Sequence, residues 1–267
     1  MVPDTKNNQV HKDQTGRINL TKTNPFHKRP LISLCTTVKD RLAHLQQTFL
    51  RNMNDNENYR DCEFLLLNYS CPNPQTEEWV RRVLGSYITS GRVNYYYYPN
   101  SLTFDRSHAR NLAFRVAQGD IICNIDADNF TGKSFVAYVS ASLSFEDSFL
   151  CGPVDGRGLA GRICVRRKDW ESVGGFDERF KSYGYEDIDF TNRLSMIGLT
   201  KKKITNEKFC KSIAHSSKLR MQHHLEDRRR ENIAIMESNI EQGIACPNGS
   251  SFGHGRVKKN FSYWLEV

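Results

Sequence analysis

Short apolar runs alternate with helix-patterned stretches between residue 30 and about residue 130, and this alternation constrains the fold more than any other sequence feature. Four apolar runs have the length of buried strands: 31–35, 63–67, 93–98 and 121–125. Three intervals carry apolar residues at helical spacing: 42–53, 79–88 and 106–117. Strands and helices at this spacing form βαβ units, so we predict an α/β domain with a mostly parallel central sheet flanked by helices. Ligands of such sheets bind at the carboxyl ends of the strands.

The chain beyond residue 130 is less regular. Its pattern predicts a strand at 161–166, a turn at 173–176, a helix at 186–197 and a charged helix at 223–241 that leads into a tail. Residues 1–29 have no apolar period, and we expect a flexible N-terminal arm there. The expected organisation is one domain over 30–235 with a C-terminal extension, 236–267, packed on it.

Charge and cysteine usage narrow the class of protein. A net charge of +8 permits a phosphate-rich partner, either a nucleotide or a nucleic acid, although the basic runs at 201–203 and 228–230 are ordinary for a solvated face. No window of 18 apolar residues occurs and the N-terminus is polar, so we expect a soluble, cytoplasmic chain without a transmembrane segment. The eight cysteines form no C-x-x-C pair, which favours free thiols in a reducing compartment.

Two carboxylates, Asp126 and Asp128, follow the apolar run at 121–125 directly. Carboxylates at positions i and i+2 at the end of a buried strand can present oxygens to a divalent cation that also bridges a diphosphate. The alternative is that the pair serves only a turn or a helix cap, which is common after a strand.

A second acidic cluster lies at the start of the helix predicted at 186–197. Glu186, Asp187 and Asp189 crowd positions where the helix dipole favours anions, yet their mutual repulsion raises some of their pKa values. A carboxylate placed this way can accept the proton of an attacking hydroxyl. The alternative is capping by Glu186 and Asp187, with Asp189 in a solvent-facing pair with Arg193.

Taken together, the segments 107–111, 119–128 and 174–194 resemble the GT-A-fold glycosyltransferases of the family 2 type. The stretch Gly-Tyr-Glu-Asp-Ile-Asp at 184–189 is also similar to the C-terminal motif of β-1,4-galactosyltransferases. The resemblance covers roughly residues 30–235. It implies a single GT-A domain, Rossmann-like, with a C-terminal helical extension, a nucleoside-diphosphate-sugar donor and a Mn²⁺ or Mg²⁺ cofactor.

The resemblance also implies roles for the acidic residues. Asp128 would bind the metal directly, whereas Asp126 would contact the ribose, or the metal through water. Asp187 would be the catalytic base of an inverting transfer, and Glu186 would help to bind the acceptor. His215, in Ile-Ala-His-Ser, would complete the metal site, although an ordinary histidine at a strand end is the alternative.

Further residues of the resemblance point to the nucleotide. Arg110 and Asn111 match an Arg-Asn pair near the nucleotide pocket, where the guanidinium fork suits a phosphate or carboxylate; the alternative for Arg110 is a surface arginine. After the first strand, Thr36, Thr37 and Arg41 correspond to the nucleoside-binding loop. After the second strand this chain departs from its relatives, because Leu67 replaces an expected carboxylate, while Asn68 can still bond a base or a ribose. Uridine remains the favoured base.

We therefore expect a metal-dependent, inverting hexosyl- or pentosyltransferase that uses a UDP-sugar and a hydroxyl of a glycan or polysaccharide acceptor. Trp170 could serve as an acceptor platform, although tryptophan is more often a core residue. One alternative acceptor is a hydroxylated base of DNA, which the basic charge and the four tyrosines at 95–98 permit. Another alternative is a non-catalytic nucleotide-sugar-binding module. A nucleotidyltransferase is disfavoured because the residues after the first strand contain no glycine-rich phosphate loop.

Overall fold

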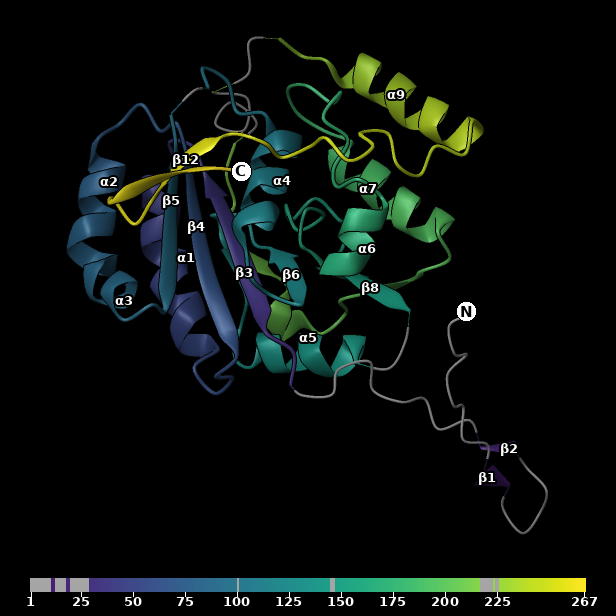
Figure 1. Ribbon diagram of the computed structural model, residues 1–267, viewed down its shortest axis with the longest axis horizontal. Helices are drawn as coiled ribbons and strands as arrows, with labels where there is room; N and C mark the ends of the chain where they lie inside the picture. Colours follow the sequence, from purple (N-terminus) through teal and green to yellow (C-terminus); the bar gives the residue numbers. More distant parts are fainter. Residues whose placement is uncertain are drawn as a thin grey trace, which may run out of the picture.

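The computed structural model describes residues 11–12, 18–19, 29–99, 101–144, 147–216, 223 and 226–267. Its centre is a nine-stranded sheet (Figure 1). In spatial order the strands are β10 (Thr200–Lys203), β8 (Ser148–Cys151), β9 (Ile163–Arg166), β6 (Ile121–Asn124), β3 (Ile32–Val38), β4 (Cys62–Tyr69), β5 (Val93–Tyr98), β12 (Arg256–Lys259) and β13 (Tyr263–Glu266). Strands β9 and β12 run opposite to all the others, so the sheet is mostly parallel, as predicted.

Helices cover both faces of this sheet and make a three-layer α/β/α architecture. One face packs against α1 (Leu42–Asp55), the continuous helical segment α2 (Gln75–Trp79), η1 (Val80–Leu84) and α3 (Gly85–Thr89), and α5 (Phe135–Leu143). The other face packs against α4 (Arg106–Val116), α6 (Arg167–Ser172) and α7 (Glu186–Met196). Helix α9 (Arg229–Glu241) lies outside α7 and contacts it.

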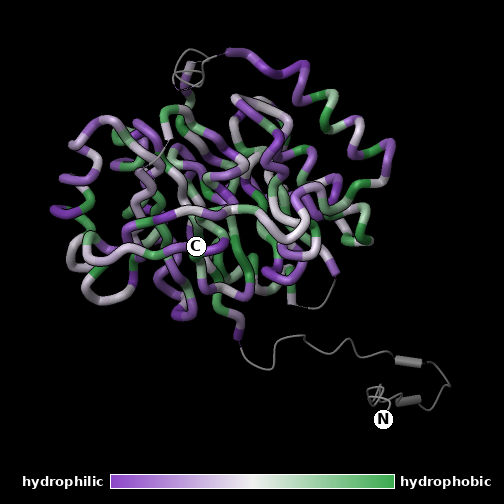
Figure 2. The backbone as a smooth tube through the Cα atoms, turned by 45° about the horizontal axis from the view of Figure 1, so that its top comes forward, coloured by the Kyte–Doolittle hydropathy of each residue, from purple (hydrophilic) through white to green (hydrophobic). Residues whose placement is uncertain are grey.

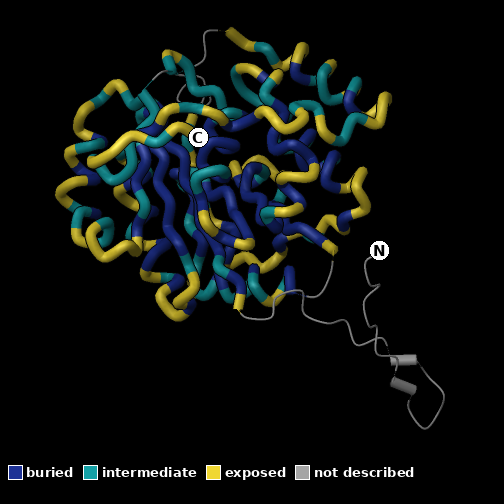
Figure 3. Tube along the Cα trace, viewed as in Figure 1, coloured by how far each residue is buried: buried dark blue, intermediate teal, exposed yellow. Residues whose placement is uncertain are grey.

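The register of the central strands explains the two cores. Along β4, Phe64 and Leu66 belong to the core under α1, whereas Leu65 and Leu67 belong to the core under α4. Because successive side chains point to opposite faces, a strand covered on both sides needs apolar side chains on both, as in the run Phe64–Leu67 of β4. Figures 2 and 3 show the result, with hydrophobic, buried strands inside and hydrophilic, exposed helix faces outside.

Local signals set the bounds of α4. This helix precedes β6, the strand that Asp126 and Asp128 follow. The Asp105 side chain caps its first turn by accepting from the backbone N–H of His108 at 3.4 Å. Gly119 then allows the chain to turn into β6, since a Cβ at this position would lie 2.6 Å from the backbone nitrogen of Ser33. A side chain larger than glycine's would therefore push α4 away from the sheet.

The structure confirms the four strands and the helices predicted up to residue 125, and it confirms the helix at 186–197 to within one residue. The charged helix begins at Arg229 rather than at residue 223. Sequence analysis missed α5, β8 and β10, and it did not predict that the tail contributes β12 and β13 to the sheet. These strands are short, and the lysines of β10 suit an edge strand rather than a buried one.

Three further expectations concern the N-terminal residues, the cysteines and a membrane span. Within the range predicted as an arm, the structure describes a small ladder between β1 (His11–Lys12) and β2 (Ile18–Asn19) and residue 29; the rest of that prediction lies outside the described residues. All eight cysteines are free thiols. Among the described helices, none combines the length and the apolar character needed to cross a bilayer.

Candidate active site

A cavity of about 390 Å³ opens at the carboxyl ends of β3 and β6, where a mostly parallel sheet places its ligands. Its volume lies in the range of small-molecule sites. Most of its wall consists of residues that follow strands or begin helices. The lining residues are Thr37, Lys39, Arg41, Phe104, Arg106, Arg110, Asp126, Ala127, Asp128, Val154, Gly158, Ala160, Gly161, Tyr183, Gly184, Tyr185, Glu186, Asp187, Ile188, His215, His223 and Arg229.

Asp128 and His215 meet in this cavity although 87 residues separate them. Their contact follows from a two-stranded ladder between β7 (Asn129–Phe130) and β11 (Lys211–Ser212). The backbone N–H of Ile213 continues the ladder by donating to the Asp128 carbonyl at 2.8 Å. As a result, Nε2 of His215 lies 2.6 Å from a carboxylate oxygen of Asp128. The side chains are 10% and 17% exposed, so both remain accessible from the cavity.

The chemistry of these two side chains fits a divalent cation. A carboxylate oxygen is the preferred ligand of Mg²⁺ and Mn²⁺, and a neutral imidazole is a common transition-metal ligand. No cluster of three or more histidine, cysteine, aspartate or glutamate side chains with metal-binding geometry occurs in the described part of the chain. Two protein ligands leave most of the coordination sphere open, which suits a cation that also binds the phosphates of a nucleotide.

Arg110 is not a surface residue, because it is only 3% exposed. Its Nη2 lies 3.4 Å from Asp126 and its Nη1 lies 3.0 Å from Glu186. The guanidinium therefore joins the strand end that carries the D-x-D to the first turn of α7. Burial acts to raise the pKa of Asp126, but Arg110 and the Asn124 amide outweigh burial and lower it. Asp126 is thus held as a carboxylate.

Glu186 and Asp187 begin α7 and differ in their surroundings. Glu186 is 4% exposed; besides Arg110, its carboxylate accepts from the backbone N–H of Gly184 at 3.1 Å. Asp187 is half-buried in the cavity wall. Burial raises the pKa of Asp187 to about 6, Glu186 acts in the same direction, and Arg110 opposes both. A carboxyl group with such a pKa is suited to accepting a proton near neutral pH.

Several residues predicted for the nucleotide lie elsewhere. Thr37 and Arg41 line the cavity, whereas Thr36 and Asn68 are buried and do not. The Asn68 amide donates to the Tyr95 hydroxyl at 3.0 Å and accepts from the backbone N–H of Cys71 at 2.9 Å. These bonds use the Asn68 amide for folding, so its position does not favour a nucleotide contact.

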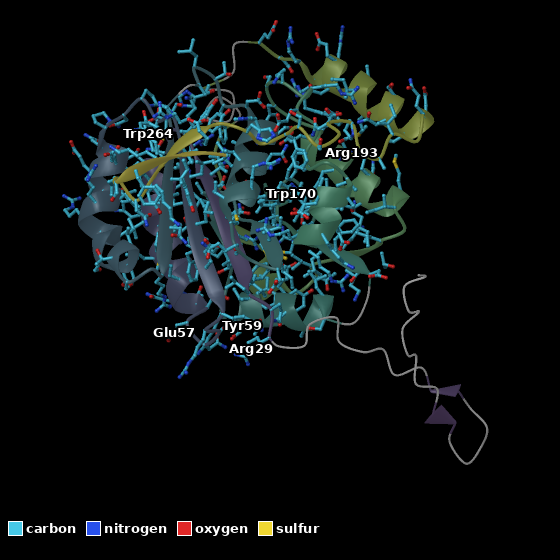
Figure 4. All side chains as sticks on the ribbon, in the orientation of Figure 1. Arg29, Glu57, Tyr59, Trp170, Arg193 and Trp264 are labelled. Atoms are coloured by element: carbon cyan, nitrogen blue, oxygen red, sulfur yellow. The ribbon has the colours of Figure 1, made fainter. Side chains whose placement is uncertain are left out.

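Asn111 and Trp170 likewise support the fold. Asn111 is fully buried and forms two hydrogen bonds with the Phe176 backbone, each of 2.7 Å. Trp170 is 2% exposed, packs edge-on against Phe114 and Phe252, and does not line the cavity. Figure 4 shows Trp170 among the helices of this side of the sheet. The core interpretation of Trp170 was therefore right.

The alternative interpretation of Asp189 and Arg193, a solvent-facing pair, was right about the pair and wrong about its exposure. The two side chains do pair, with 2.7 Å between Nε and a carboxylate oxygen, but they are only 1% and 0% exposed. Asn239 of α9 donates to the same Asp189 carboxylate at 2.8 Å, and Arg193 donates to the carbonyls of Val173 and Gly175. Through these contacts the buried network fixes α7 against α9.

Sequence reasoning also missed members of the cavity wall. They are Lys39, Phe104, Arg106, Tyr183, Tyr185, His223 and Arg229. Helical spacing alone could have identified Arg106, because it precedes Arg110 by one turn and comes within 3.9 Å of Glu186. His223 and Arg229 follow the last predicted motif, in a charged segment for which the sequence suggested a solvated face rather than a site.

One family model matches a segment of the sequence. Residues 153–224 match the family described as the N-terminal domain of galactosyltransferase. This segment contains every residue of the cavity wall between Val154 and His223, including Asp187 and His215. Among curated proteins, none matches the sequence.

Solved structures extend the likeness over most of the chain. The mannosyltransferase PcManGT from Pyrobaculum calidifontis, in complex with GDP-Man and Mn²⁺, has a TM-score of 0.60 at 15% identity, covering 86% of this chain and 77% of its own. A variant of Drosophila β1,4-galactosyltransferase 7, in complex with manganese, UDP-Gal and xylobiose, has a TM-score of 0.53 at 15% identity and covers 75% and 77%. TarS of S. aureus has a TM-score of 0.51 at 13% identity, and the match covers 66% of this chain and 58% of TarS residues 1–349.

The fold is therefore that of the GT-A glycosyltransferases. The matched segment and the fold agree on one class of enzyme, the glycosyltransferases. The comparisons give no support to a DNA acceptor.

Proposed function

We propose that the protein is a metal-dependent, inverting glycosyltransferase that moves a sugar from a nucleoside diphosphate, UDP in the first instance, to a glycan hydroxyl. One observation carries the proposal: a candidate cation pair, Asp128 with His215, and a candidate base, Asp187, open into the same cavity. Arg110 lies between the cation pair and the base, because it forms ion pairs with Asp126, two residues before Asp128, and with Glu186, next to Asp187. A transferase of this kind needs both functions within the reach of one sugar.

On the donor side, Asp128 and His215 would hold a divalent cation, which when bound neutralises charge on the departing diphosphate. Asp126 is held as a carboxylate by Arg110 and can contact the ribose, or the cation through water. Thr37 and Arg41, at the end of β3, are the remaining predicted nucleotide residues that reach the cavity. The relatives in complex with GDP-Man or UDP-Gal and manganese support a donor of this class.

On the acceptor side, Asp187 would take the proton of the attacking hydroxyl. The new bond joins the acceptor oxygen to the anomeric carbon, and the bond from that carbon to the diphosphate oxygen breaks with its electron pair. Displacement from the opposite face inverts the anomeric configuration. Glu186, buried and held by Arg110 and the Gly184 N–H, would fix the first turn of α7 and thereby the position of Asp187.

The test combines binding and turnover. We would measure the transition temperature of the purified protein with UDP, GDP and their sugars, each with Mn²⁺ or with EDTA, and then the release of free sugar from the donor that binds. We expect one nucleotide to raise the transition temperature only with Mn²⁺, and the Asp128→Ala variant to lose this rise.

The control is Asp61→Ala. This substitution removes the same charge from an exposed position just before β4, at the opposite end of the sheet from the cavity. It should leave the nucleotide effect unchanged. No nucleotide effect with Mn²⁺ would contradict the proposal, and binding without any turnover would favour a non-catalytic module instead.

A further inference from the structure

Tyr185 has a backbone conformation that a tyrosine rarely adopts. Its φ is +74°, directly after Gly184 at +105° and directly before α7. In this left-handed region the Cβ of an L-residue crowds the backbone, which is why glycine usually occupies such positions. A bulky residue persists there only where the surroundings or the function require its side chain.

Packing does not account for that side chain. The residue is half-buried and lines the cavity beside Glu186 and Asp187. Within the described residues, no hydrogen bond involves its hydroxyl and no aromatic ring stacks on it, although the Arg229 guanidinium interacts with Tyr185 electrostatically. Tyr69 provides a contrast, since its hydroxyl bonds His108 at 2.8 Å and its ring stacks on Tyr98. The Tyr185 ring thus adds surface to the cavity and little to the core.

The neighbouring wall has the composition of a sugar subsite. Tyr183 lies on the other side of Gly184, with the Arg106 guanidinium 4.4 Å from its ring centre. Arg229 packs over the same turn, because a Cβ at Gly184 would lie 3.7 Å from its Cγ. Aromatic faces with polar groups at their edges suit a pyranose ring, which has an apolar face and a hydroxylated rim.

We propose that Tyr185 is a specificity-determining residue. Its ring binds the face of the acceptor sugar, so that the attacking hydroxyl of the sugar faces Asp187. The inference rests on the proposed function and deepens it. Tyr185 is two residues from the candidate base, whereas Asp128 and His215, the candidate donor site, flank the ladder of β7 and β11. The acceptor, rather than the diphosphate, is the substrate part that must approach Asp187.

The experiment compares Tyr185→Gly and Tyr185→Phe with the wild type. Glycine removes the ring at a position whose backbone favours glycine, so the variant should fold with an unchanged or higher transition temperature. The matched control is Ser134→Gly, which relieves a similar φ of +67° at the start of α5, outside the cavity wall. Binding of neutral disaccharides, xylobiose among them, would be measured by NMR with Mn²⁺ and UDP present.

We expect Tyr185→Gly to weaken disaccharide binding at least tenfold, while the rise in transition temperature caused by UDP and Mn²⁺ stays as in the wild type. Tyr185→Phe, which keeps the ring, should bind within threefold of the wild type, and Ser134→Gly should equal it. Equal binding by Tyr185→Gly, an equal loss of the effect of UDP and Mn²⁺ on the transition temperature, or failure of the wild type to bind any disaccharide would overturn the inference. The rise in transition temperature caused by UDP and Mn²⁺ tests the proposed function separately, because it does not depend on Tyr185.

Discussion

Replacing Asp187 by asparagine should abolish transfer and, at the same time, stabilise the protein. The folded state raises the pKa of Asp187 from its ordinary 3.8 to about 6, first through burial and then through Glu186. A shift of about 2 pKa units corresponds to about 3 kcal/mol if the site were dry. Water in the open cavity screens part of this energy, so we expect the uncharged side chain to stabilise the protein by about 1–2 kcal/mol.

The stabilisation by Asp187→Asn depends on pH. Because the pKa is raised on folding, the neutral carboxyl is the form that the fold prefers, and this contribution is fully present below about pH 4. It is lost as the pH rises from about 4 to about 6, where Asp187 ionises within the folded protein. The asparagine variant keeps a neutral side chain throughout, so its advantage should be absent at pH 4 and complete above pH 6.

The assay is calorimetric unfolding in EDTA at pH 4 and pH 8, with the exposed Asp61→Asn as a charge-matched control. At pH 8 we expect Asp187→Asn to raise the transition temperature by about 4 °C, and we expect no rise at pH 4 or in the control. Transfer should fall at least about 100-fold, the usual contribution of a general base. A lower transition temperature at pH 8, or an equal rise at both pH values, would refute the electrostatic reasoning.

Three further predictions concern the same cavity. His215→Ala should weaken nucleotide binding in the presence of Mn²⁺ at least tenfold, measured by titration calorimetry. Its free energy of unfolding, measured in urea, should stay within about 0.5 kcal/mol of the wild type. Arg110→Ala removes the cation that pairs with the buried Glu186 and with the partly exposed Asp126, and should lower the free energy of unfolding by about 3–5 kcal/mol in urea, a loss that adding Glu186→Gln should partly reverse. Since Asp187 must be ionised to accept a proton and its pKa is about 6, kcat/KM of the wild type should fall about tenfold per pH unit below pH 6 and level off above it.

Local patterns were sufficient for the framework of the fold. Buried strands between β3 and β6 are apolar on both faces, and the helices between them repeat at 3.6 residues, so both periods are readable in one dimension. The same logic located Asp126 and Asp128 at the end of a strand and Glu186 and Asp187 in the first turn of a helix. Short strands such as β8 and β10 carry too few residues to show a period.

The roles of individual polar residues depended on contacts that no local pattern encodes. Asn68 and Asn111 look like ligand-binding amides in the sequence, and the structure uses both to satisfy buried groups of the fold. The sequence suggested a phosphate or carboxylate partner for Arg110, and the structure shows that it bridges two carboxylates. A side chain's role is set by which partners desolvate and pair with it, and those partners come from other elements.

The sequence by itself determined the layered α/β framework and the carboxylates at the edge of the sheet, because periodicity and strand ends are properties of neighbouring residues. Only the tertiary structure decided that His215 meets Asp128 across 87 residues, and that burial raises the pKa of Asp187. The physical reason is that the β7 and β11 ladder and the burial around Arg110 form only when distant segments pack together, and packing is what sets distance and desolvation.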